Sequence, residues 1–350
     1  MFLLKKFSFF YFIFLLYKFI KGHHISLVND EYYVVNSPIF CIRESFMYFR
    51  NEVYRVCVNS NEDEDFNIHI YVQKRKGNSW EIEDELLKGK KKKSFISFFS
   101  YVYDEEIIII LCDFEGYGKN KKINCFRSHS STGVDFTTEN INVPHDIFNN
   151  KDLSYYSSFP YEFNGEKYLL ICGIINYIFK SYEGDFIGCA ASSDKGSTWN
   201  TKFHFRYDGT KHFTSYFLLK VKIFNNKLAF FFHYASTSEE SGKYIECSNK
   251  SNNDFYCEDV HFDKEKSLRS VIKLNDYFIT SFVNKNDRKA CYLYYTNENS
   301  FLIKPKNTGD ELSGCYRASF IKIHDNKIMF VHLSGYGVYN IYTFRYLNYK

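Results

Sequence analysis

The sequence predicts an all-β protein, a six-bladed β-propeller whose ring is closed by an N-terminal strand. Three observations predict this fold: a turn-and-strand unit that recurs six times, a loop motif at a similar place within those units, and cysteines that follow the units in order. A unit of about 55 residues cannot bury its faces alone, so such units pack side by side into a ring or a solenoid. Four short strands would account for the length of each unit.

Residues 1–22 are predicted to be a secretory signal peptide, which leaves residues 23–350 as a single propeller domain. The segment has the order typical of such leaders: the basic pair Lys5 and Lys6, an apolar block, and the small residue Gly22 at the expected cleavage point. The block is about half the roughly 20 residues that a membrane-spanning helix needs, so an uncleaved anchor is the weaker interpretation. We therefore expect a secreted, soluble chain without a membrane anchor of its own.

Composition excludes several classes of protein. Aromatic residues make up 20% of the chain, and the formal net charge is only +4, which is not the composition of a disordered protein. Removal of the leader takes away four lysines and no acidic residue, so the mature chain has a formal charge of zero. A protein that binds nucleic acid needs a net basic surface, and this class is therefore excluded.

Each repeated unit begins with a turn of Asn or Asp and continues into a strongly apolar strand. The turns begin at Asn51, Asp104, Asn164, Asn225, Asn275 and Asp325. Such residues suit tight hairpins, and the apolar runs suit strands buried between sheets. Too few residues follow Asp325 to complete a sixth blade, whereas residues 32–35 form an unassigned strand-like run near the N-terminus. We predict that this run completes the sixth blade and hides its sheet edges.

The loop motif is clearest in the third unit, where Ser192, Asp194, Gly196, Thr198 and Trp199 match the Asp-box pattern S-x-D-x-G-x-T-W. Degenerate versions occupy residues 77–80, 133–136, 252–255 and 298–301. We expect each to form the hairpin loop between the two outer strands of a blade. There, the Asp accepts loop N–H groups, the Gly adopts a positive φ, and the aromatic residue packs onto the blade. This interpretation is structural, and a catalytic role for Asp194 is the disfavoured alternative.

Ten cysteines in a secreted chain favour five disulfides. Connectivity does not follow from the count, but the blades make sequential pairing the simplest assignment: Cys41–Cys57, Cys112–Cys125, Cys172–Cys189, Cys247–Cys257 and Cys291–Cys315. Each pair would close a short loop and contribute about 3 kcal/mol. No cysteine pair has CxxC spacing and no HExxH pattern occurs, so neither a metal site nor a cofactor is expected.

With these features in place, the sequence is similar to the cysteine-rich protective antigen family of malaria parasites. The similarity runs from about Cys41 to the C-terminus and rests on the signal peptide, the five cysteine pairs and five segments. These segments are residues 69–74, 105–112, 194–199, 302–305 and 339–342.

The resemblance implies a propeller of sialidase-like fold without sialidase activity. It also implies secretion from the micronemes to the merozoite surface. There, such a protein acts as an adaptor that joins the EGF-containing protein Ripr to a further invasion ligand, a reticulocyte-binding-protein homologue or its equivalent, for erythrocyte entry. No interface residue is carried over, because adaptor surfaces are not short motifs. The chain is expected to be a monomer on its own.

The residues argue against catalysis. A sialidase needs three arginines around the substrate carboxylate, a Tyr–Glu nucleophile pair and an Asp acid. Only Arg43 lies roughly where the first arginine would fall, and it lacks the expected sequence context, so we assign no catalytic residue. A degenerate lectin that binds sialylated glycans is the alternative, because aromatic pockets with a few polar groups can hold a sugar without hydrolysing it.

Two further surface features have modest interpretations. The basic run at residues 88–93 follows several acidic residues, so a solvated loop between blades is favoured over an anionic cell-surface contact. Asn249, in the sequence Asn249-Lys250-Ser251, is a candidate N-glycosylation site in the predicted loop of the fourth blade, where it would be accessible.

Overall fold

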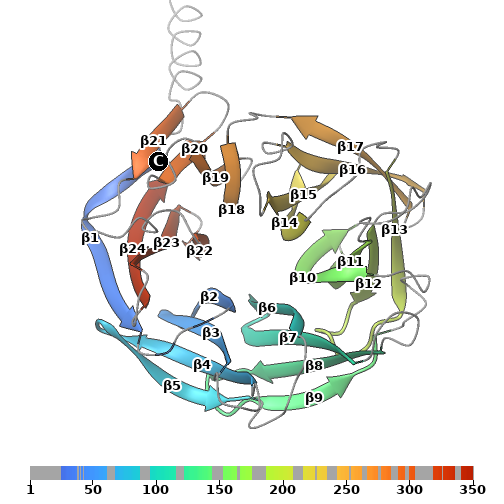
Figure 1. Ribbon diagram of the computed structural model, residues 1–350, viewed down its shortest axis with the longest axis horizontal. Helices are drawn as coiled ribbons and strands as arrows, with labels where there is room; N and C mark the ends of the chain where they lie inside the picture. The colour runs from blue at the N-terminus through green and yellow to red at the C-terminus, as the bar shows by residue number, and fades with distance from the viewer. Residues whose placement is uncertain are drawn as a thin grey trace, which may run out of the picture.

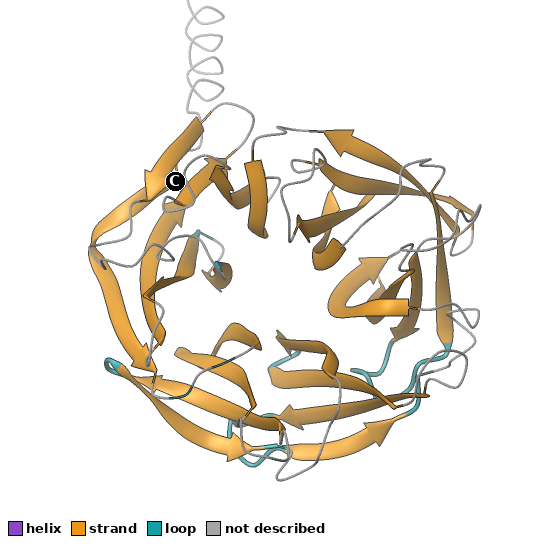
Figure 2. Cartoon of the chain, viewed as in Figure 1, coloured by secondary structure: helices purple, strands orange, loops and turns teal. Residues whose placement is uncertain are grey.

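The described part of the computed structural model contains 24 strands, arranged as six blades around a ring (Figure 1). The described residues are 25–37, 39, 41, 43–60, 68–86, 95–115, 122–143, 153–163, 166–175, 187–207, 216–224, 227–234, 243–251, 254–261, 266–274, 277–284, 291–295, 299–303, 318–324, 326–335 and 340–349. All regular elements among them are strands (Figure 2), and no helix in this part of the chain is long and apolar enough to cross a membrane.

The first three blades follow one another along the chain. Blade 1 contains β2 (Arg43–Phe49), β3 (Glu52–Ser60), β4 (Ile68–Lys76) and β5 (Ser79–Glu85). Blade 2 contains β6 (Phe95–Tyr103), β7 (Glu106–Glu115), β8 (Lys122–Ser130) and β9 (Thr137–Ile141). Blade 3 contains β10 (Leu153–Phe163), β11 (Glu166–Ile175), β12 (Ile187–Ser192) and β13 (Thr201–Tyr207).

The remaining blades complete the ring. Blade 4 contains β14 (Tyr216–Phe224), β15 (Lys227–Tyr234), β16 (Lys243–Ser251) and β17 (Asp254–His261). Blade 5 contains β18 (Lys266–Leu274), β19 (Tyr277–Asn284), β20 (Cys291–Tyr295) and β21 (Asn299–Ile303). Blade 6 contains β22 (Ser319–His324), β23 (Lys327–Gly335), β24 (Asn340–Tyr349) and the N-terminal strand β1 (Ile25–Ser37).

The predicted ring closure is confirmed, because β1 pairs with β24 in an antiparallel ladder that runs from Ile25 opposite Tyr349 to Ser37 opposite Asn340. The two ends of the described chain thus complete blade 6 together, as Figure 1 shows at the meeting of its blue and red strands. The ladder replaces two exposed sheet edges with paired backbone.

The recurring Asn and Asp turns connect the first two strands of each blade. In all six blades the strand register leaves two residues between the last paired positions of this hairpin, for example between Phe49 and Glu52. In blade 1 both turn residues have positive φ, at Arg50 (48°) and Asn51 (67°). Two consecutive positive φ values are the mark of a type I′ turn, which Asn adopts at low cost.

The loop motifs connect the third and fourth strands of blades 1 to 5, which explains why the chain has five of them for six blades. In blade 6 these two strands are β24 and β1, which come from the two ends of the described chain, so no hairpin joins them. Since strands alternate in direction within a blade, the motif loops lie on the same face of the ring as the Asn and Asp turns.

In blades 1 to 3, the aromatic residue of the motif packs against the preceding blade as well as its own. Trp80 lies in a buried cluster with Ile321 and Met329 of blade 6, and Trp199 lies in one with Ile108 and Ile110 of blade 2. Phe136 packs onto the cluster between blades 1 and 2. Burial of one such ring contributes on the order of 3 kcal/mol, so these three aromatic residues act as wedges that fix blades 1, 2 and 3 against the blade before each.

Blades 3 and 4 are joined in a way that the sequence does not predict. Their outermost strands, β13 and β17, pair in a parallel ladder from His204 opposite Asp254 to Tyr207 opposite Cys257. The eight strands of the two blades therefore form one continuous sheet, whereas each of the other four blades is a separate four-stranded sheet. An outer edge of this propeller can thus accept a parallel strand.

Two glycines with positive φ provide a matched test of blade packing. A methyl group on Gly133 (φ +88°) would lie 2.5 Å from Oη of the buried Tyr54 in blade 1, whereas one on Gly77 (φ +59°) would meet nothing within 4 Å. We expect Gly77→Ala to cost only about 1 kcal/mol of backbone strain and Gly133→Ala to cost clearly more. Chemical denaturation of both variants measures this difference, and equal losses would show that the close approach of blades 1 and 2 is not tight.

Candidate functional site

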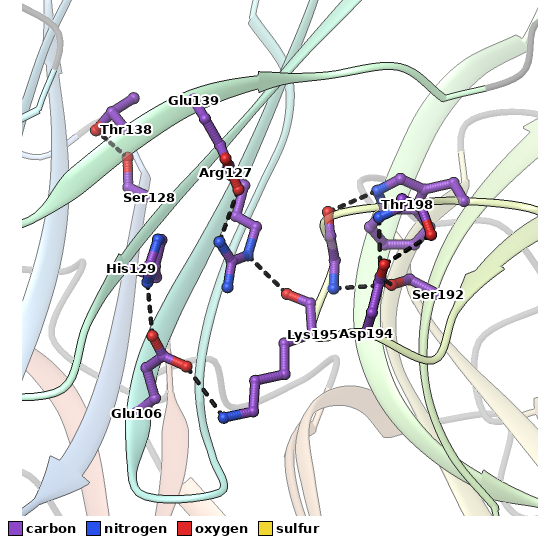
Figure 3. A network of polar contacts seen from close by, with 12 residues as sticks. Glu106, Arg127, Ser128, His129, Thr138, Glu139, Ser192, Asp194, Lys195 and Thr198 are labelled. Carbon is purple, nitrogen blue, oxygen red and sulfur yellow. Dashed lines mark hydrogen bonds and ion pairs between the residues drawn. The ribbon is translucent and has the colours of Figure 1, made fainter.

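The Asp-box loop of blade 3 is a closed set of hydrogen bonds (Figure 3). The Asp194 carboxylate accepts bonds from the Ser192 hydroxyl (2.7 Å), from the Thr198 amide (2.8 Å) and from the Thr198 hydroxyl (2.7 Å). The Gly196 amide donates to the Ser192 hydroxyl (2.8 Å), and the indole of Trp199 donates to the Gly196 carbonyl (2.9 Å). Gly196 has φ +90°, a conformation open to glycine without strain.

These bonds set the charge state of Asp194. Burial raises its pKa, but the hydrogen bonds from Ser192 and Thr198 together lower it by more, so the pKa lies below the ordinary value. A carboxylate with its acceptor positions filled and a lowered pKa is poorly suited to act as a general acid. The arrangement is that of a structural loop.

The same loop is fastened to blade 2 by a polar network that spans the junction (Figure 3). Arg127 donates from Nε to the Lys195 carbonyl (2.8 Å) and from Nη1 to Glu139 (2.7 Å). The Lys195 ammonium in turn donates to Glu106 (3.2 Å), whose other oxygen lies 2.6 Å from Nδ1 of His129. Arg127 is buried, whereas the side chain of its partner Glu139 is 44% exposed at the surface.

Glu106 is the acceptor at the centre of this network. Burial raises its pKa, while the hydrogen bonds and charges of His129 and Lys195 lower it by more, so the pKa lies below its ordinary value. A second cross-blade ion pair joins Lys167 of blade 3 to Asp104 of blade 2 at 3.1 Å. The charged groups at this junction therefore serve blade-to-blade attachment.

A second polar cluster lies where blade 6 meets blade 1 and is centred on the fully buried Arg55. Its guanidinium donates to Gln73 (3.0 Å from Nε) and to Ser37 (2.8 Å from Nη2), and Nη1 lies 3.8 Å from a Glu44 oxygen. The same group stacks 4.5 Å from the ring centroid of Trp80. Ser37 is the last residue of the closing strand β1, so Arg55 ties the ring closure to blade 1.

Three of the predicted cysteine pairs are bonded in the structure, namely Cys41–Cys57, Cys112–Cys125 and Cys247–Cys257. Cys189 is also disulfide-bonded and lies opposite Cys172 in the register of β11 and β12. Among cysteines with described side chains, none is free. The side chains of Cys172, Cys291 and Cys315 lie outside the described residues, so the pairs Cys172–Cys189 and Cys291–Cys315 stay predictions.

Other predicted positions are placed only in part. Asn249 is exposed, but it lies near the end of strand β16 rather than in the following loop. Arg43 begins β2, and its side chain lies outside the described residues, as do the leader at residues 1–22 and the basic run at 88–93. Within the described part of the chain, no group of three or more His, Cys, Asp or Glu side chains is arranged to hold a metal ion.

Sequence reasoning missed both Arg55 and Arg127 as organising residues. Arg55 lies inside the strongly apolar strand β3, and Arg127 lies in the more polar strand β8, directly after Cys125 and Phe126. A lone charge in a strand expected to be buried must have internal partners, because an unpaired buried charge is too costly. An arginine within a strand expected to be buried was therefore the sequence signal that could have identified these two residues.

Comparison with known proteins identifies the family. The profile described as Cysteine-Rich Protective Antigen 6 bladed domain, abbreviated CyRPA, matches residues 33–341, which is most of the chain. The chain belongs to the CyRPA family. A search among curated protein sequences found no match.

Solved structures place the CyRPA chain among sialidase-like propellers. A protein of unknown function from Dyadobacter fermentans aligns with a TM-score of 0.61 at 12% identity, over 93% of this chain and 99% of that one. The haemagglutinin-neuraminidase ectodomain of parainfluenza virus 5 gives 0.54 at 9%, over 93% and 86%. Trypanosoma rangeli sialidase gives 0.51 at 12%, over 89% and 54%. At these identities the likeness concerns fold alone, and the predicted six-bladed sialidase-like architecture is confirmed.

The Arg55 cluster predicts a large loss of stability on truncation. Arg55→Ala removes the cation from beside Glu44 and Gln73 and should lower the free energy of unfolding by about 3 to 5 kcal/mol. Arg55→Lys keeps the charge but not the fork of donors, and should lose an intermediate amount. Denaturant midpoints measure both changes, and an Arg55→Ala variant as stable as wild type would contradict the role given to Arg55.

The lowered pKa of Asp194 predicts an acid-dependent contribution to stability. A carboxyl whose pKa is lower in the folded state stabilises fully above its unfolded pKa of about 4, and this contribution disappears as pH falls through the folded value. Asp194→Asn should therefore cost about 1 kcal/mol at pH 7 and progressively less below about pH 4. Thermal melts of the wild-type chain and the Asp194→Asn variant, from neutral pH down through the acid range, test this, and a gap independent of pH would count against it.

Proposed function

We propose that the chain is a secreted, non-enzymatic adaptor in a merozoite invasion complex. It would bridge Ripr and a further invasion ligand, a reticulocyte-binding-protein homologue or its equivalent, during erythrocyte entry. The observation that carries this proposal is membership of the CyRPA family over residues 33–341. Signal-peptide cleavage near residue 22, passage through the micronemes and a monomeric free state belong to the same proposal.

The contacts of the described charged residues support a rigid binding surface rather than an active site. Arg55, Arg127 and Asp194, which would otherwise be candidates for substrate contact, are each committed to partners within the fold. The wedges and disulfides hold the blades in fixed positions, so a partner would meet a surface that requires little ordering on binding. Disulfides of this kind are typical of secreted proteins.

A reconstitution experiment tests the adaptor. The chain from residue 23 onward, purified with its disulfides intact, should bind purified Ripr and the purified reticulocyte-binding-protein homologue separately. All three should sediment as one complex, in which neither end partner needs direct contact with the other. Trypanosoma rangeli sialidase, which shares the fold, is the matched control and should bind neither. Absence of binding to both partners would refute the proposal.

The same preparation separates the adaptor from an enzyme or a lectin. With a fluorogenic sialoside we expect no hydrolysis by this chain, against turnover by the control sialidase. On a glycan array we expect no retention of sialylated glycans. Hydrolysis would overturn the non-enzymatic part, and glycan binding without protein binding would favour the lectin.

A further inference from the structure

The outer edge of blade 2 has properties expected of a strand-pairing site. Its outermost strand, β9, is the last of its sheet, and among the described strands none pairs with its outer side. The side chains of Thr137, Thr138, Glu139 and Asn140 are all exposed. Figure 1 shows β9 on the rim of the ring, outside β8.

The backbone groups that face outward can be assigned from the register. Cys125 lies opposite Cys112 with a Cα–Cα distance of 4.1 Å, the spacing of a pair that does not exchange hydrogen bonds. The N–H and C=O of Cys125 therefore point to β9, where Ile141 lies opposite. Because successive residues alternate, the N–H and C=O groups of Thr138 and Asn140 point away from the sheet.

This edge is held rigidly from within the blade. The Thr138 hydroxyl lies 2.6 Å from that of Ser128, and Glu139 accepts the bond from Arg127, as Figure 3 shows. The ladder between β8 and β9 has no bulge. An edge already fixed in extended form would pay little entropy on pairing with a second strand.

The outer edge of the neighbouring blade 1 is protected against pairing with a further strand. In β5 of blade 1, a register shift beside Ile82 disrupts the ladder, and the strand is crowded with acidic residues. Natural proteins protect exposed edges with bulges, charge, proline or short length. Strand β9 has neither bulge, lysine nor proline, and its protection consists of its short length of five residues and the single charge of Glu139. Blades 3 and 4 show the alternative outcome, in which an outer edge pairs with a parallel strand.

The charge around β9 indicates the kind of strand that fits. Asp135, just before β9, is exposed, and the side chain of Glu139 is 44% exposed. Asp84 of β5 accepts a hydrogen bond from the Phe136 amide (3.2 Å), which adds a third carboxylate at this end of the strand. The cation of the site, Arg127, is almost buried beneath it. Among the described residues around β9, the exposed charge is therefore acidic.

We propose that the outer edge of β9 binds an extended, lysine- or arginine-bearing segment of Ripr by β-strand addition. The backbone groups of Thr138 and Asn140 would supply the hydrogen bonds, and Asp135 and Glu139 would meet the basic side chains. This inference rests on the proposed function, since it locates one of the adaptor's two contacts.

A pair of substitutions at one position tests the backbone contact. Asn140→Pro removes an N–H that faces outward and leaves the ladder to β8 intact, a place where proline is tolerated in sheets. Asn140→Ala removes the side chain and keeps the N–H. Against immobilised Ripr, the alanine variant should bind with an affinity within about twofold of wild type. The proline variant should bind at least about tenfold more weakly than wild type. Asp135→Asn should weaken binding by a few-fold, and more strongly at low salt.

The outcomes are separable. A proline variant that binds Ripr as wild type does would overturn the β9 inference and leave the adaptor proposal standing. A wild-type chain that fails to bind both partners overturns the adaptor and this inference with it.

Hydrogen exchange provides a second measurement in case the proline variant does not fold. In the wild-type complex with Ripr, the amides of Thr138 and Asn140 should become protected, while the edge of β5 should not change. Unchanged exchange at β9 would overturn the inference.

Discussion

The pairing of β1 with β24 is the constraint on which the rest of the structure depends. A propeller blade buries both of its faces only against neighbours, so a ring open between blades 6 and 1 would expose two apolar sheet faces at once. Strand β1 supplies the fourth strand of blade 6, and the Arg55 cluster secures its end to blade 1. The β1–β24 ladder therefore holds β1 within the sheet of blade 6, and the Arg55 guanidinium holds the end of β1 against blade 1.

At the junctions of blades 2 and 3 and of blades 6 and 1, the contacts between blades combine an apolar wedge with a polar cluster. Trp199 fills the junction between blades 2 and 3, and Arg127 and Lys195 bind the loop that carries it. The wedge supplies most of the free energy, because the burial of a large aromatic side chain contributes more than a single polar bond. The polar bonds supply direction, since each fixes where the loop sits on the neighbouring blade. A rigid ring of this kind keeps its surface constant, which is what a bridging protein needs.

The fold was largely readable from the sequence because its signals are local. Two-residue hairpins at residues such as Asn51, motif loops and paired cysteines each depend on a few neighbouring residues, so composition and spacing reveal them. The Arg55 and Arg127 clusters join residues from separate strands, and their partners are visible only once the strands are placed. The parallel pairing of β13 with β17 depends on the orientation of two whole blades. The candidate binding edge of β9 is defined by what does not pair with it, which no local pattern encodes.

The antiparallel pairing of β1 with β24 also orders the events of biosynthesis. Ser37 and its partner Asn340 are separated by about 300 residues of chain, and β1 emerges from the ribosome long before its partner exists. Blades 1 to 5 contain only strands that are close in sequence, so they can form one after another as the chain enters an oxidising compartment. Blade 6 must wait, and until it forms β1 is an unpaired strand beside a half-built ring. A chaperone that binds extended strands would therefore be expected to bind the segment of β1. The interval of greatest aggregation risk would end when β24 has been synthesised and pairs with β1.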